Sequence, residues 1–225
     1  MNYLEHLWSP EVLLRENNFL PHSACAEIRK SMLASPTYMG TIVKHDGIAT
    51  VDSRIRRATN IEIDACLRSV VNVGLRSIKV RLDRYFGIET TDIQPTQYLL
   101  YRRGDFFRRH RDAARESHFE DLVNRKISVV LFLNDRNTTG DHHFEGGDLS
   151  FIGRFRNGTE ELTRIDVTPC EGMLIAFPSQ LLHEVLRVRR GLRFTAVSWL
   201  TSKCDIEVAE PAPHDSSVES PTAAS

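Results

Sequence analysis

The chain has 225 residues, of which 41% are hydrophobic and 26% charged, with 12 glycines and 9 prolines. This composition is that of a globular protein, and it excludes a fully disordered chain and a collagen-like chain. No apolar run approaches 18 residues, so no membrane-spanning helix is expected. The net charge is −1, from 29 basic and 30 acidic side chains, so overall charge gives no reason to expect a nucleic-acid or membrane partner.

The first third of the chain is predicted to be largely helical. We expect helix within residues 1–35, with Ser23 as an N-cap, followed by loops and an edge hairpin within 36–60. Residues 61–86 carry apolar side chains three and four positions apart and form the clearest predicted helix, which ends at Gly87. Residues 1–93 are therefore expected to be mainly helical.

From residue 94 the pattern changes to short β-rich runs separated by glycine-containing turns, which is typical of an all-β barrel or sandwich over 94–204. Residues 205–225 contain three prolines and five acidic residues without Lys or Arg, and are predicted to be a disordered acidic tail. The predicted strands are 96–101, 126–133, 148–152, 163–168, 173–177, 183–188 and 192–200.

Four cysteines lie far apart in the chain and form no CxxC pair, so we expect reduced thiols in a cytoplasmic protein. The first residues include Glu5 and Glu11 and lack a basic segment, which argues against a secretory signal.

Two histidines and one aspartate are candidate metal ligands. His110 and Asp112 are two residues apart, and on a strand they would share one face. Taken alone, this pair is more typical of a surface ion pair. His183 lies at the start of an apolar run, and by itself it is more typical of a histidine packed in the core. Together they form the two-histidine, one-carboxylate set of non-haem Fe(II) oxygenases. No thiolate accompanies them, which argues against a structural zinc site.

Arg193 and Thr195 follow His183 on the next predicted strand and also share a face. A permanently charged, planar guanidinium beside a hydroxyl is suited to bind a carboxylate. A 2-oxo acid held there would supply the electrons that an iron site needs to activate O2.

The stretch from Gln97 to Trp199 resembles the catalytic domain of the prolyl-4-hydroxylase-type Fe(II)/2-oxoglutarate dioxygenases. The matching segments are Tyr101-x-x-Gly104-Asp105-Phe106-Phe107-x-x-His110-x-Asp112, Ile127–Asp135, Gly146-Gly147-Asp148-Leu149, Pro169-x-x-Gly172-x-Leu174-x-x-Phe177, Leu182-His183-Glu184-Val185 and Val188-x-x-Gly191-x-Arg193-x-Thr195-x-x-x-Trp199.

The resemblance implies a mainly β fold with N-terminal helices, whose core is a double-stranded β-helix (jelly roll) of two antiparallel sheets. It also implies that residues 1–93 are a helical support region of the same domain as the catalytic core, residues 94–204. It implies His110, Asp112 and His183 as Fe(II) ligands, and Arg193, Thr195 and Tyr101 as the 2-oxoglutarate site. The implied activity is O2-dependent hydroxylation of an unactivated C–H, most readily of a prolyl residue in a protein or peptide, while 2-oxoglutarate becomes succinate and CO2. Ascorbate commonly keeps such iron reduced.

The chain departs from the family pattern in two places. Phe132 stands where some relatives carry a tyrosine, and Arg193 stands where collagen-type members usually place lysine. The second departure favours the bacterial and oxygen-sensing branch. Tyr98 is interpreted as a packed strand aromatic rather than a site residue.

The sequence leaves the substrate open. The arginines around the metal motif are interpreted either as solvated residues at strand edges or as a rim that attracts anions. A nucleic-acid substrate is disfavoured, because Trp199 stands where demethylase-type relatives carry an arginine. The loop 113–125 is expected to close over substrate, and His142 or His143 to contact it or to be solvated. The alternatives are a hydroxylase of a free amino acid or small biosynthetic intermediate, and a non-catalytic metal- or ligand-binding β-helix protein.

Overall fold

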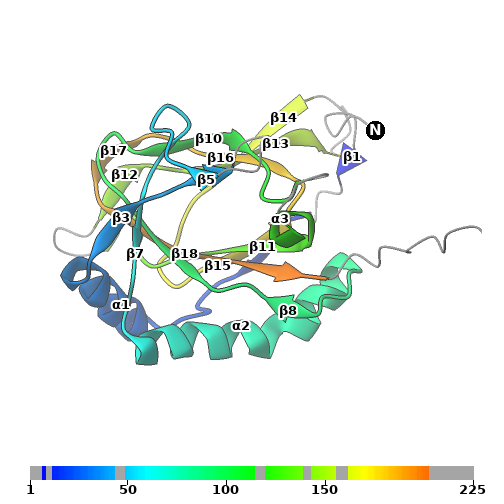
Figure 1. Ribbon diagram of the computed structural model, residues 1–225, viewed down its shortest axis with the longest axis horizontal. Helices are drawn as coiled ribbons and strands as arrows, with labels where there is room; N and C mark the ends of the chain where they lie inside the picture. Colours follow the sequence, from blue (N-terminus) through cyan, green and yellow to red (C-terminus); the bar gives the residue numbers. More distant parts are fainter. Residues whose placement is uncertain are drawn as a thin grey trace, which may run out of the picture.

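The computed structural model describes residues 7–8, 12–43, 49–114, 120–138, 143–155 and 162–202. Two sheets face each other, and the two long helices cover the outer face of one of them (Figure 1). This is the predicted mainly β architecture with N-terminal helices.

The larger sheet has eight strands in the order β2-β15-β11-β18-β9-β7-β3, with β8 also paired to β18. All of its pairings are antiparallel. Its strands are β2 (Leu14–Glu16), β3 (Thr37–Met39), β7 (Thr59–Ile61), β8 (Asp92–Ile93), β9 (Gln97–Tyr101), β11 (Arg125–Phe132), β15 (Leu174–Pro178) and β18 (Arg193–Thr201).

The second sheet has six strands in the order β1-β13-β16-β10-β6, with β14 also paired to β13. Its strands are β1 (Leu7–Trp8), β6 (Arg56–Arg57), β10 (Phe106–His110), β13 (Leu149–Phe155), β14 (Leu162–Val167) and β16 (Leu182–Val185). Two short pairs complete the β structure: β4 (Ile42–Val43) with β5 (Ala49–Thr50), and β12 (Phe144–Gly146) with β17 (Val188–Gly191).

The helices are α1 (His22–Ala34), α2 (Ala65–Phe86) and the short α3 (Glu120–Val123). Helix α2 ends at Gly87 as the sequence predicts, but it begins at Ala65 and not at residue 61, because Ile61 is the last residue of β7. The Asp64 side chain accepts hydrogen bonds from the N–H groups of Cys66 and Leu67, and Gly87 ends the helix in the left-handed conformation at φ 64°. No described helix is both long and apolar enough to cross a membrane.

The prediction for residues 1–35 is wrong in part. Only α1 is α-helical among the described residues of this range, and it begins at His22, so Ser23 is not its N-cap. The segments Leu7–Trp8 and Leu14–Glu16 are instead edge strands that pair with β13 and β15. Their helix-like apolar spacing is overridden by the backbone hydrogen bonds that the open sheet edges offer.

The 36–60 segment contains the expected hairpin, β4 with β5, but also the strands β3, β6 and β7. The long predicted run 183–188 is divided between β16 and β17, which belong to different sheets. The predicted acidic tail, 205–225, lies outside the described residues.

Successive side chains on the central strands of the larger sheet point to opposite faces and pack into two separate hydrophobic cores. On β18, Phe194, Ala196 and Leu200 pack toward the helices, together with Val71, Leu75 and Ile28. Residues 193, 195, 197 and 199 point the other way and line a cavity between the sheets. The same period of two places Tyr98 in the helix-facing core and Tyr101 at the cavity, which agrees with the interpretation of Tyr98 as a packed aromatic.

Replacing Asp64 by alanine should destabilise the protein by about 1 kcal/mol, because two N–H groups in the first turn of α2 lose their acceptor. Chemical denaturation monitored by circular dichroism measures this effect. Glu89→Ala, which removes an exposed carboxylate after the same helix, is the control and should leave the midpoint unchanged. Equal midpoints for the two variants would contradict the capping role.

Candidate active site

Strand pairing in the six-stranded sheet brings the two candidate histidines together. His110 is the last residue of β10 and lies opposite His183 of the antiparallel neighbour β16. Their ring centroids are 4.2 Å apart. The pairing of β10 with β16 therefore brings together two histidines that are 73 positions apart in the sequence.

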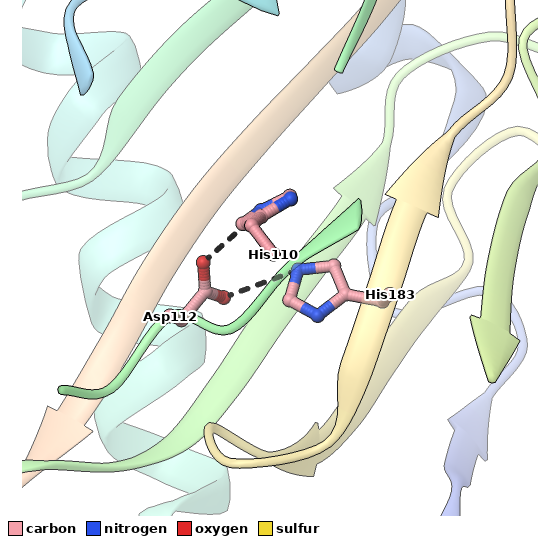
Figure 2. Close-up of side chains that lie close together, drawn as sticks. All are labelled: His110, Asp112 and His183. Atoms are coloured by element: carbon pink, nitrogen blue, oxygen red, sulfur yellow. Dashed lines mark ion pairs between the residues drawn. The ribbon is translucent and has the colours of Figure 1, made fainter. Parts of the chain in front are cut away.

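Asp112 reaches the same point by a different route from the one predicted. Strand β10 ends at His110, so the two residues do not share a strand face, and that part of the prediction is wrong. The N–H groups of Asp112 and Ala113 both donate to the carbonyl of Ser179, at 3.0 and 3.1 Å. This bend turns the carboxylate toward the histidines, as Figure 2 shows.

The three side chains converge on one point. Asp112 Oδ1 lies 3.5 Å from His110 Nε2, and Asp112 Oδ2 lies 3.6 Å from His183 Nε2. One donor atom from each residue lies within 4.8 Å of the others, so the group could hold a metal ion.

Backbone carbonyls orient both rings for that role. Nδ1 of His110 lies 2.8 Å from the carbonyl oxygen of Arg108, and Nδ1 of His183 lies 2.8 Å from that of Leu181. Because a carbonyl only accepts, each Nδ1 carries the proton and each Nε2 lone pair remains available. This arrangement is typical of metal-binding histidines.

Burial places the ligands in their unprotonated forms. Desolvation and the neighbouring His110 lower the pKa of His183 to about 4, although Asp112 opposes the shift. Burial alone would raise the pKa of Asp112, but His183 and His110, which are cationic when protonated, hold it well below its usual range. At neutral pH the site thus offers a neutral imidazole and an ionised carboxylate, the forms that bind metals.

Arg193 lies in the same cavity and is 1% exposed. Its Nη1 donates to Thr195 Oγ1 at 3.4 Å, and its Cζ lies 5.0 Å and 5.3 Å from the rings of Tyr101 and Phe132. Burial lowers its pKa to about 10, against the effects of Tyr101 and Asp148, so the group stays cationic at neutral pH.

The Arg193 guanidinium is only partly satisfied within the described protein. Its Nε is buried without a hydrogen-bond partner, and the described residues supply it no ion pair. Buried charges are normally paired, so this one calls for an anionic ligand.

The cavity has a volume of about 370 Å³ and connects the three-residue group with Arg193. Apolar side chains form much of its wall, and Phe107 stacks on His110 with centroids 3.5 Å apart. Arg125 lies 3.6 Å above the ring of Trp199. Sequence reasoning did not assign either contact, because each depends on how the folded chain places the two side chains.

Only some of the other residues that were predicted to contact substrate line the cavity. Residues Ala113, Ala114, Leu122 and Arg125 of the loop 113–125 line the cavity, whereas 115–119 lie outside the described residues. His143 is not a lining residue, and its backbone carbonyl packs against Gly191 and accepts from the N–H of Leu192. His142 lies outside the described residues.

Sequence reasoning missed Asn134, which holds the backbone on both sides of Arg193. The fully buried Asn134 side chain donates to the carbonyl of Leu192 at 2.7 Å and accepts from the N–H of Phe194 at 2.9 Å. The available signal was its position directly after the apolar run 129–133, because a polar group next to buried apolar residues is costly when it has no partner.

Asn134→Ala should destabilise the protein by about 2–3 kcal/mol, because two backbone groups beside Arg193 lose their partners in a buried setting. Thermal unfolding measures the loss. Asn137→Ala, at an exposed position three residues later, provides the matched control. The clamp assignment is wrong if both variants unfold at the wild-type temperature.

Lowering the pH should destabilise the metal-free protein because His183 becomes protonated on unfolding. Because its folded pKa is about 4 and its unfolded pKa is near 6.5, the unfolded chain binds more protons between these values. The free energy of unfolding should therefore fall as pH drops through this window, by up to about 1.4 kcal/mol per pH unit from this group. Denaturation curves at several pH values should show a shallower dependence for His183→Gln, and an equal dependence would contradict the assignment.

Known proteins were compared with this chain. The sequence profile described as the 2OG-Fe(II) oxygenase superfamily matches residues 96–201. A PKHD-type hydroxylase of Shewanella oneidensis is 32% identical over 108 residues, which cover 48% of this chain and 43% of the relative. A PKHD-type hydroxylase of Prochlorococcus marinus is 26% identical over 190 residues, covering 82% and 78%. The aligned region is thus less than half of the Shewanella protein.

Solved structures share the fold. A Pseudomonas putida prolyl-4-hydroxylase superposes with a TM-score of 0.63 at 24% identity, over 86% of this chain and 94% of that one. A prolyl hydroxylase from Trichoplax adhaerens, solved with a hypoxia inducible factor peptide, gives a TM-score of 0.67 at 20% identity, over 86% and 84%. The matched profile spans every residue of the three-residue group and Arg193, so residues 96–201 are similar to the 2OG-Fe(II) oxygenase superfamily over the part of the chain that forms this site.

Proposed function

We propose that this protein is an Fe(II)- and 2-oxoglutarate-dependent dioxygenase that hydroxylates an unactivated C–H of a prolyl residue in a protein or peptide. 2-Oxoglutarate would be decarboxylated to succinate and CO2 in the same turnover. The observation that carries this proposal is the convergence of His110, Asp112 and His183 on one point of a cavity that also contains the buried, cationic Arg193.

The donor set suits ferrous iron. Two imidazole nitrogens and one carboxylate on one side of a metal leave positions open for further ligands, which is the pattern of non-haem Fe(II) oxygenases. Bound iron would supply the activation of O2. His110, Asp112 and His183 would hold it, with the backbone carbonyls of Arg108 and Leu181 fixing the two rings.

The co-substrate would be oriented by residues on the larger sheet. Arg193 would bind the distal carboxylate of 2-oxoglutarate, which would give a partner to a guanidinium whose Nε and charge have none among the described residues. Thr195 and Tyr101 lie against the guanidinium and would complete this end of the site. The apolar wall from Val130, Leu149 and Val185 would exclude water from the reacting groups.

The prolyl substrate is supported by the names of similar proteins. Both compared structures are prolyl hydroxylases, and one was solved with a peptide. We also propose that residues 1–93 support the same domain. Ascorbate as a reductant, and a cytoplasmic location, stay predictions.

Purified protein with Fe(II) and 2-oxoglutarate should release succinate. Asp112→Ala and His110→Ala should abolish this release because each removes a metal ligand. Arg193→Ala should raise the KM for 2-oxoglutarate by about 10- to 100-fold, since a charge-assisted hydrogen bond contributes about 1.5–3 kcal/mol. Arg190→Ala, which removes an exposed arginine of the neighbouring strand β17, is the control.

Normal turnover by Asp112→Ala would refute the ligand assignment, and metal binding without succinate release would favour the non-catalytic alternative. A gain of one oxygen mass, sought in prolyl peptides and in free amino acids, separates the two substrate classes.

A further inference from the structure

A second buried guanidinium reaches the cavity from the opposite sheet. Arg56 begins β6, lies opposite Phe107 of β10 and is 8% exposed. Its Nη1 donates to the carbonyl of Thr41 at 2.9 Å. Its Nε is buried and has no hydrogen-bond partner among the described residues.

The surroundings hold this guanidinium beside the candidate metal centre. Arg56 Cζ lies 4.9 Å from the centre of the Phe107 ring, and that ring stacks on His110 at 3.5 Å with an interplanar angle of 17°. Gly40 packs on the guanidinium, where an added Cβ would lie 2.9 Å from Arg56 Nε and 3.2 Å from the carbonyl of Ala58. The glycine leaves the space that this arginine occupies.

The charges lining the cavity are unbalanced. Among the described lining residues, Asp112 is the sole carboxylate, whereas Arg56, Arg111, Arg125 and Arg193 are all cationic. Arg111 donates to the carbonyl of Gln180 at 2.9 Å, and Arg125 donates to Gln94 at 2.8 Å and stacks on Trp199.

Under the proposed function, Arg193 is compensated by 2-oxoglutarate, and Asp112 by the metal. Arg56 then remains as a buried cation whose side chain makes one hydrogen bond to the described protein, to a neutral carbonyl. A buried cation of this kind favours an anionic ligand, and a planar guanidinium fits a carboxylate.

We infer that Arg56 binds a carboxylate of the primary substrate, next to the Phe107–His110 stack. The inference rests on the proposed function and narrows its substrate to an acid. Two sources supply the group: the α-carboxylate of a free amino acid, or the side chain of an acidic residue beside the proline in a peptide.

Matched acids and amides test this subsite by binding. The full chain is loaded with Co(II) and 2-oxoglutarate, and its thermal unfolding is followed as each probe is added. One pair is L-proline and L-prolinamide; the other is the capped dipeptides acetyl-Pro-Asp-amide and acetyl-Pro-Asn-amide. We expect the acid of one pair to bind at least about tenfold more tightly than its amide, as for a hydrogen bond to a charged group.

Variants assign the preference to Arg56. Arg56→Gln should abolish the difference between acid and amide, and Arg56→Lys should retain part of it. Arg57→Gln removes the neighbouring arginine of β6, which is half exposed and faces Asp105, and should keep the full preference.

Three results would overturn the inference: no acid preferred in either pair, a preference that survives in Arg56→Gln, or a loss of 2-oxoglutarate affinity in Arg56→Gln as large as that in Arg193→Ala. Because binding is measured without turnover, the two proposals fail separately. A protein that prefers the acid but releases no succinate contradicts the proposed function alone.

Discussion

The site depends on the antiparallel register between β10 and β16. That register sets His110 opposite His183, and a shift of one residue would turn one ring to the other face of the sheet. On one side of the histidine pair, the Ser179 carbonyl just before β16 accepts the N–H groups of Asp112 and Ala113 just after β10. On the other side the strands stay paired, Phe107 with Val185, but the register shifts between this pair and the histidines.

The larger sheet contributes to the same cavity through a different regularity. Its central strands are buried on both faces, one against the helices and one against the other sheet. Because successive side chains of a strand point to opposite faces, each residue packs into one core or the other, and Arg193, Thr195 and Trp199 lie on the cavity side. Helices α1 and α2 have no residue in the cavity; they cover the face that would otherwise expose the larger sheet to water (Figure 1).

Burial gives these polar groups their chemical character. Desolvation keeps His183 neutral, while the charges around Asp112 keep that carboxylate ionised. In the same low-dielectric setting, the Nε groups of Arg193 and Arg56 destabilise the free protein, because neither has a hydrogen-bond partner among the described residues. Such groups persist where ligands complete them, which is why we interpret the two arginines together as the anion-binding ends of one cavity.

Local sequence was sufficient for the features that depend on near neighbours. The apolar spacing of 65–86, its Gly87 boundary, the β-rich runs after residue 94 and the alternation on β18 all arise from short-range geometry, and the motif residues identified the metal and co-substrate candidates. The Asp64 cap that starts this helix was found only in the structure. The edge strands at 7–8 and 14–16, the bend that carries Asp112, the Asn134 clamp and the Arg56–Phe107–His110 stack required the tertiary structure. Each of these depends on a hydrogen bond or ring contact with a partner far away in the chain, and no local pattern encodes which partner the folded sheets will bring into reach.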